Sequence, residues 1–242
     1  VALERDMGNI CSGAESSSTG PRQTEIRKVA HTNISVAEFL SVCIFLGEEC
    51  GKIIREVNES SDLKTASKGK DNPVTIADLK VQKTIEVCLN ALYPSLCVMG
   101  EESKESIADI EPVITAAAFN EAIKESIKQE ELNENQANRR EWIQNTLRTY
   151  YDEDDVCIED FETFNTADAV VWIDPLDGTS DFVKGNLSAV TVLIGLAING
   201  RSRLGVVHNP FTEEDSEVGK TIFGSAEHGV FKLSYDRNMS QQ

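Results

Sequence analysis

The spacing of apolar and polar positions predicts two long amphipathic helices in the N-terminal half of the chain. Over residues 35–58, apolar or small side chains recur every three or four positions, which is typical of one buried helix face. Residues 76–92 repeat the pattern up to Tyr93-Pro94, a pair that ends helices. Both segments begin with a capping-box pattern, Ser35 with Glu38 and Thr75 with Asp78.

A second pattern, short runs rich in β-branched residues, predicts strands. These runs occupy residues 96–99, 170–174, 187–198, 202–208, 220–223 and 229–233. Asn199-Gly200 separates two of them and is a strong hairpin signal, because both turn positions need positive φ. The order of elements predicts an α+β fold in which two long helices cover an antiparallel or mixed sheet.

The remaining segments are polar. Residues 1–33 are rich in Ser, Thr and Gly, and we expect a disordered leader before one domain over residues 34–242. Residues 104–168 are less regular and acidic, and they predict an inserted region with helices at about 114–128 and 138–150. The acidic run 152–155 within it is typical of a solvated surface rather than a metal site.

Charge and cysteine content restrict the partners. Among 242 residues, 23 are basic and 41 acidic, a net charge of −18, which disfavours a nucleic acid or an anionic membrane as partner. A small anionic substrate would need bound cations to enter such a protein. We find no membrane-spanning apolar run and no signal peptide. The six cysteines form no Cys-x-x-Cys pair, which disfavours zinc and favours a reduced, cytoplasmic location.

The most informative stretch is residues 170–182, an apolar strand that ends in carboxylates. Asp174 and Asp177, with the Leu176 carbonyl between them, can direct three oxygens at one point, which suits Mg²⁺. Gly178 allows close approach of the backbone, and Thr179 begins a helix whose free N–H groups favour a phosphate. Taken alone, an Asp-x-x-Asp-Gly turn is equally consistent with a strand followed by an acidic surface turn.

Two other segments supply carboxylates. Asp78 lies in the first turn of a predicted helix, and Glu101 follows a predicted strand and Gly100. Each has a purely structural interpretation, Asp78 as a capping residue and Glu101 as a surface turn residue, with Glu102 as the alternative ligand. The presence of all three motifs in one chain favours a functional interpretation.

Together the motifs at residues 71–78, 100–102 and 172–179 resemble the inositol monophosphatase superfamily of Mg²⁺-dependent, lithium-sensitive phosphatases. Residues 190–195, 204–210 and 220–224 are similar to its 3′(2′),5′-bisphosphate nucleotidases, more than to its inositol monophosphatases or inositol polyphosphate 1-phosphatases. The resemblance implies the N-terminal domain of an α-β-α-β-α sugar-phosphatase fold, truncated, with the second domain missing. The sheet face that would pack on that domain is expected to be exposed and apolar.

The resemblance also implies roles for residues. Asp78 and Thr179 would orient and deprotonate a water molecule, and Gly178 and Thr179 would donate N–H groups to phosphate. The implied Mg²⁺ ligands are Glu101, Asp174, the Leu176 carbonyl and Asp177. The expected reaction is hydrolysis of adenosine 3′,5′-bisphosphate to AMP and phosphate. An inositol phosphatase, or a non-catalytic metal-binding module, is the alternative; oligomeric state stays open. The three histidines, His31, His208 and His228, are expected to be non-catalytic.

Overall fold

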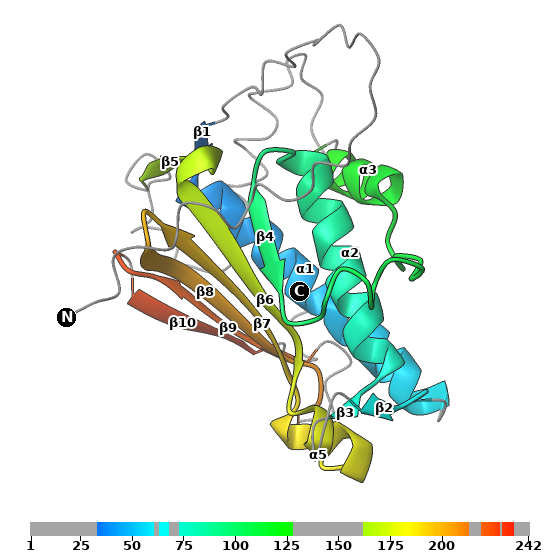
Figure 1. The fold of residues 1–242 in the computed structure, drawn as a ribbon. Coiled ribbons are helices and arrows are strands. Elements are labelled where there is room, and N and C mark those ends of the chain that lie inside the picture. The colour runs from blue at the N-terminus through cyan, green and yellow to red at the C-terminus, as the bar shows by residue number, and fades with distance from the viewer. Residues whose placement is uncertain are drawn as a thin grey trace, which may run out of the picture. The chain divides into compact units, whose positions relative to one another are not determined.

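The computed structural model describes residues 33–60, 63–67, 73–127, 162–212, 219–227 and 229–234. The predicted leader, the predicted helix at 138–150 and the acidic run 152–155 lie outside these residues. Within them the chain forms an α+β fold with one large mixed sheet, as the sequence pattern predicts (Figure 1).

The large sheet has six strands: β4 (Cys97–Gly100), β6 (Ala169–Asp177), β7 (Thr191–Ile198), β8 (Arg201–Asn209), β9 (Lys220–Ser225) and β10 (Gly229–Ser234). Their order across the sheet is β10-β9-β8-β7-β6-β4. Within this sheet β4 and β6 pair in parallel, which the long connection between them permits, whereas the other neighbours pair antiparallel. Two small antiparallel pairs accompany it: β1 (Asn33–Ser35) with β5 (Thr163–Asn165), and β2 (Ala66–Ser67) with β3 (Pro73–Val74).

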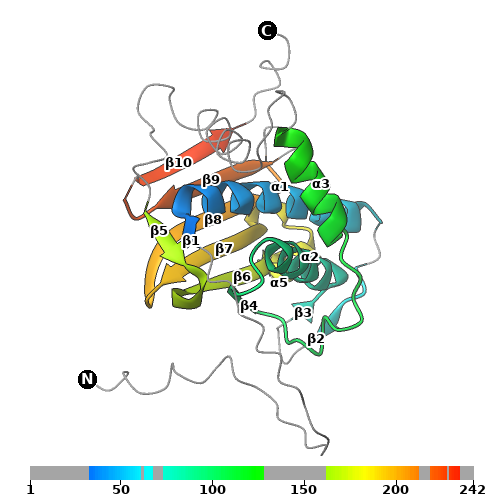
Figure 2. The same cartoon turned by 90° about the horizontal axis from the view of Figure 1, so that it is seen from above.

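Helices cover one face of the sheet (Figure 2). Helix α1 (Val36–Ser60) packs on β7, β8 and β9, and α2 (Ile76–Leu92) packs on β6 and on α1. Helix α3 (Ala116–Ile127) packs on α2 and confirms the first predicted helix of the insertion. The core lies between the helices and the inner sheet face and includes the buried thiols of Cys43, Cys50 and Cys88. None of the described helices combines the length and apolar character needed to cross a bilayer.

The helix starts differ from each other in how they are capped. At α2, Thr75 is the N-cap and Asp78 completes the capping box, as predicted. At α1 the Ser35 half of the predicted capping box is wrong. Ser35 belongs to β1, and its hydroxyl has no hydrogen-bond partner among the described residues. The first helical N–H, of Val36, instead donates to the Glu162 carbonyl at 3.0 Å. A backbone carbonyl from another segment thus satisfies an N–H group that a side-chain cap would otherwise accept from.

The predicted hairpin is confirmed. Strands β7 and β8 pair antiparallel around Asn199 and Gly200, which have φ of 50° and 72°. The expected strand start at residue 187 is wrong, because a short 3₁₀ helix, η3 (Leu187–Ala189), precedes β7. A second 3₁₀ turn, η2 (Thr166–Asp168), leads into β6.

Candidate active site

The central motif forms the end of β6 and the turn into α5 (Thr179–Lys184). The sequence pattern predicted that the strand ends at Asp174, and this prediction is wrong. Pairing resumes at Asp177, which lies opposite Thr191, and a register shift separates the two aspartates. Between these two pairs, β6 advances by three residues and β7 by two. The motif therefore contains a β-bulge, which changes the direction in which its side chains point. Gly178 then has φ of 83°, a conformation that a residue with a Cβ adopts only under strain.

Asp174 and Glu101 bring two carboxyl groups together. Glu101 is attached to the end of β4, where its N–H donates to the Ile173 carbonyl at 3.1 Å. Its carboxyl group lies within hydrogen-bonding reach of the Asp174 side chain. Burial, together with the charges of Glu101 and Asp177, raises the pKa of Asp174 to about 6. Atom Oδ1 of Asp174 is buried without a hydrogen-bond partner in the part of the chain that the structure describes.

This carboxylate arrangement bears on metal binding. In the described residues, no three His, Cys, Asp or Glu side chains are grouped closely enough to hold an ion by themselves. The oxygen atoms of these carboxyl groups are nevertheless of the kind that a hard cation binds. The Glu101 and Asp174 carboxyl groups lie side by side, and Asp177 helps to raise the pKa of Asp174. A buried Asp174 oxygen has no hydrogen-bond donor among the described residues. The alternative ligand, Glu102, has a buried side chain.

Asp78 and Thr179 meet across the site, although about a hundred residues separate them in the chain. Asp78 is buried, and its Oδ2 accepts from both the backbone N–H (2.8 Å) and the hydroxyl (2.7 Å) of Thr75. Its Oδ1 faces the Thr179 hydroxyl at 3.0 Å. That hydroxyl also lies 2.9 Å from the Leu176 carbonyl, and its single hydrogen can serve only one acceptor. Burial raises the pKa of Asp78, and hydrogen bonds from Thr75 and Thr179 oppose the shift.

The predicted capping role of Asp78 is thus confirmed for Oδ2, while its Oδ1 is available to the Thr179 hydroxyl of the central motif. The sequence reasoning missed one buried polar residue near these groups, Gln82, which follows Asp78 by one helical turn. A polar residue at an inward-facing helix position was the only available signal.

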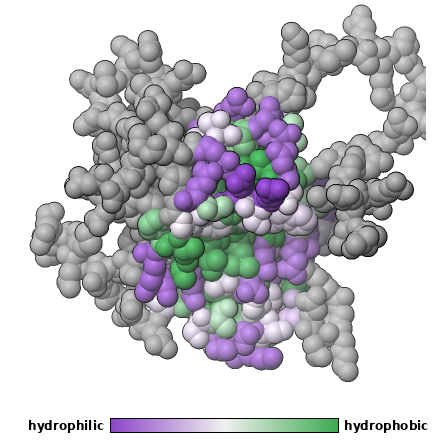
Figure 3. Space-filling view, turned by 90° about the vertical axis from the view of Figure 1, so that its left-hand side faces the viewer, coloured by the Kyte–Doolittle hydropathy of each residue, from purple (hydrophilic) through white to green (hydrophobic). Residues whose placement is uncertain are grey.

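The outer face of the sheet carries apolar residues and is partly exposed. A row of residues runs across five strands in direct register: Trp172, Gly195, Gly205, Gly224 and Val230. The three glycines lie in the middle of this row, and Trp172 and Val230 at its two ends are 56% and 76% exposed. Figure 3 shows a contiguous hydrophobic region on the side of the molecule that it presents.

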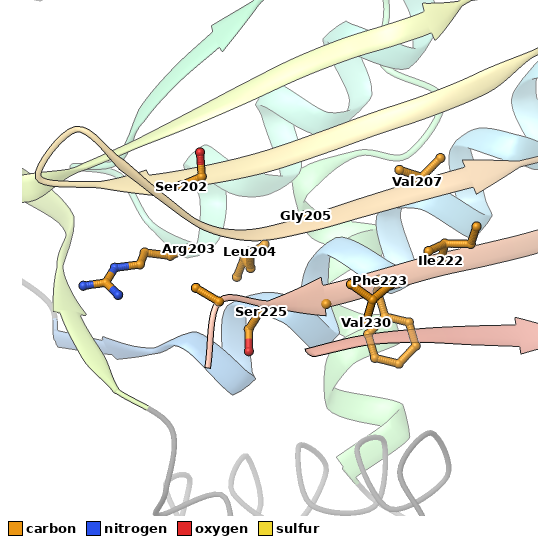
Figure 4. Close-up of a pocket in the computed structure, with 11 residues that line it drawn as sticks. Ser202, Arg203, Leu204, Gly205, Val207, Ile222, Phe223, Ser225 and Val230 are labelled. Carbon is orange, nitrogen blue, oxygen red and sulfur yellow. The ribbon is translucent and has the colours of Figure 1, made fainter. Parts of the chain in front are cut away.

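Two hollows lie along this row. One, of about 460 Å³, lies over β8, β9 and β10 (Figure 4). The other, of about 570 Å³, includes Trp172, Glu101 and Asp174 among its lining residues. The second hollow joins the apolar face to the carboxylates, so a ligand bound at the carboxylates would have apolar surface beside it.

Comparison with known proteins identifies the family. The family model described as "Inositol monophosphatase family" matches residues 35–241. The chain belongs to the inositol monophosphatase family. The match includes every carboxylate discussed above.

Curated relatives within the inositol monophosphatase family carry more specific names. The chain is 29% identical over 206 residues to 3′(2′),5′-bisphosphate nucleotidase 1 of Dictyostelium discoideum, covering 81% of the chain and 57% of that protein. It is 28% identical to the human protein of the same name, over 84% of the chain and 58% of the relative. The chain thus spans little more than half the length of these relatives. Among solved structures, the SuhB protein of Bartonella henselae aligns with a TM-score of 0.49 and 20% identity, over 81% of the chain and 52% of that chain.

Proposed function

We propose that the chain is the metal- and phosphate-binding part of a Mg²⁺-dependent phosphomonoester hydrolase that acts as a 3′(2′),5′-bisphosphate nucleotidase. The supporting observation is the contact between the Glu101 and Asp174 carboxyl groups, with a buried Asp174 oxygen that lacks a donor among the described residues. The names of the relatives from Dictyostelium discoideum and Homo sapiens support a 3′(2′),5′-bisphosphate nucleotide as substrate. A relative from Mus musculus that is 26% identical, named Golgi-resident adenosine 3′,5′-bisphosphate 3′-phosphatase, supports adenosine 3′,5′-bisphosphate.

Under this proposal Mg²⁺ is held by Glu101, Asp174, the Leu176 carbonyl and Asp177. All four contribute oxygen, the donor type that Mg²⁺ prefers. When bound, Mg²⁺ would neutralise the charge of the phosphate ester and lower the pKa of water.

The chain's own residues would position the phosphate and move the proton. The N–H groups of Gly178 and Thr179 would hold a phosphate oxygen. The Thr179 hydroxyl would accept a hydrogen bond from the attacking water while donating its own hydrogen to Oδ1 of Asp78, 3.0 Å away. A raised pKa lets Asp78 accept that proton more readily than a fully solvated aspartate. No covalent enzyme nucleophile is required.

Phosphate release from purified residues 1–242 tests the proposal. We expect release from adenosine 3′,5′-bisphosphate that requires Mg²⁺, stops with EDTA and is slow, because the chain spans little more than half the length of its bisphosphate nucleotidase relatives. Asp177→Asn should abolish release, whereas Asp168→Asn, which neutralises an exposed carboxylate on η2, should not. Faster release from inositol 1-phosphate would instead favour an inositol phosphatase, in line with a relative named inositol monophosphatase 3, from Xenopus tropicalis, at 27% identity. Mg²⁺ binding without release from any substrate would favour the non-catalytic metal-binding module.

A further inference from the structure

Gln82 on α2 is buried to 1% exposure and bonds both backbone groups of one residue. Its Nε2 donates to the Glu102 carbonyl at 2.8 Å, and its Oε1 accepts from the Glu102 N–H at 2.8 Å. The second hydrogen of Nε2 goes to Glu86 at 2.9 Å. The orientation of the amide is determined by these partners, because a flipped amide would set donor against donor at Glu102.

The chain leaves room for this amide at Gly100. A Cβ added to Gly100 would lie 2.1 to 2.4 Å from the three terminal atoms of the Gln82 side chain. Real carbon atoms do not approach that closely, so the amide occupies the space that a side chain would need. Gly100 is therefore required here for close packing, and its φ is not in the left-handed region.

Glu101 lies between two fixed points as a result. On one side, its own N–H donates to the Ile173 carbonyl of β6. On the other side, the N–H and C=O of the next residue are both held by Gln82. The backbone that carries the Glu101 carboxyl group is thus attached to β6 and to α2 within two residues. This is the carboxyl group that contacts Asp174.

We propose that Gln82 is a positioning residue that holds Glu101 against Asp174 and thereby sets the affinity of the site for a divalent cation. The inference rests on the proposed function for the ligand role of Glu101. Groups that orient metal ligands without touching the metal typically change metal affinity by roughly 10-fold to 100-fold when removed. The amide presents a donor and an acceptor side by side to Glu102, whereas a carboxylate in the same place only accepts at neutral pH.

Four variants of the full chain test the inference. Gln82→Met keeps the volume and removes all three hydrogen bonds. Gln82→Glu keeps the acceptor but places a carboxyl group against the Glu102 carbonyl and Glu86. Thr84→Val is the matched control, since Thr84 is a buried α2 residue whose hydroxyl accepts from a backbone N–H, that of Val113, at 3.0 Å. Asp174→Asn removes a proposed ligand directly.

Calorimetric titration with MgCl₂ and hydrogen exchange at the Glu101 and Glu102 amides provide the readouts. We expect Gln82→Met to weaken Mg²⁺ binding by about 10-fold to 100-fold and to speed exchange at both amides. Gln82→Glu should weaken binding as well, whereas Thr84→Val should lower stability and leave Mg²⁺ binding unchanged.

Equal Mg²⁺ affinity in Gln82→Met and wild type would overturn the inference and leave the proposed function standing. An equal loss in Thr84→Val would also overturn it, because the effect would then be general destabilisation. If wild type binds no Mg²⁺ and Asp174→Asn changes nothing, both the proposed function and the inference are wrong.

Discussion

Replacement of His208 should remove a specific part of the pH dependence of folding. His208 lies on β8 beneath α1, and its side chain is fully buried. Nδ1 hydrogen-bonds the Thr221 hydroxyl at 2.9 Å, while Nε2 has no hydrogen-bond partner within the described part of the chain. Burial, and to a lesser extent the charge of Arg55, lowers the pKa of His208 from 6.5 to about 3.

The sign of the effect follows from the direction of this shift. Because the pKa of His208 is lower in the folded than in the unfolded state, the unfolded chain binds more protons as the pH falls. The contribution to stability is therefore fully present above pH 6.5 and is lost as the pH decreases toward 3. Between pH 7 and pH 5 the loss amounts to about 2 kcal/mol in the free energy of unfolding.

Urea unfolding of wild type and His208→Gln at pH 7 and pH 5, with reductant present, measures this quantity. Burial raises the pKa of Asp78 and Asp174, which contributes the opposite pH dependence. That contribution is common to both proteins and cancels when the two pH differences are subtracted. We expect wild type to lose about 2 kcal/mol more than His208→Gln over this interval. Equal losses in the two proteins would refute the assignment of a neutral buried imidazole.

Three further outcomes are expected. Asp177→Asn should abolish Mg²⁺-dependent phosphate release and change the free energy of unfolding by less than about 0.5 kcal/mol, because Asp177 is exposed; a large fall in stability in urea unfolding would contradict this. Thr179→Ser should retain phosphate release that Thr179→Val loses, since only serine keeps the hydroxyl that faces Asp78; equal rates in the two variants would exclude the proton-transfer role. Gly51→Ala should destabilise the fold by about 1–2 kcal/mol, because the new methyl group would lie 2.3 Å from His208 Nε2 and overpacking exceeds the gain in helix propensity; unfolding at higher urea than wild type would contradict it.

Local patterns in the sequence were sufficient to predict the long helices and the strands of the large sheet, but not the short strands β1, β2, β3 and β5. Helical periodicity located α1, α2 and α3 to within two residues at each end, and Asn199-Gly200 located the β7–β8 turn. These features depend on interactions between residues close in sequence, so a short stretch of sequence is enough to predict them. Where a contact partner comes from elsewhere, the pattern failed. Ser35 looked like an N-cap, but pairing of β1 with β5 and the Glu162 carbonyl replaced that role.

For the candidate site too, some features could be predicted from the sequence and others depend on the tertiary structure. The sequence by itself determined which carboxylates are available, Asp78, Glu101, Asp174 and Asp177, because their motifs are short and ordered along the chain. Only the tertiary structure decided that Oδ1 of Asp78 faces Thr179 across about a hundred residues, and that β4 lies beside β6 so that Glu101 meets Asp174. Parallel pairing and helix docking set these distances through packing of remote segments, and no periodicity within a single segment encodes them.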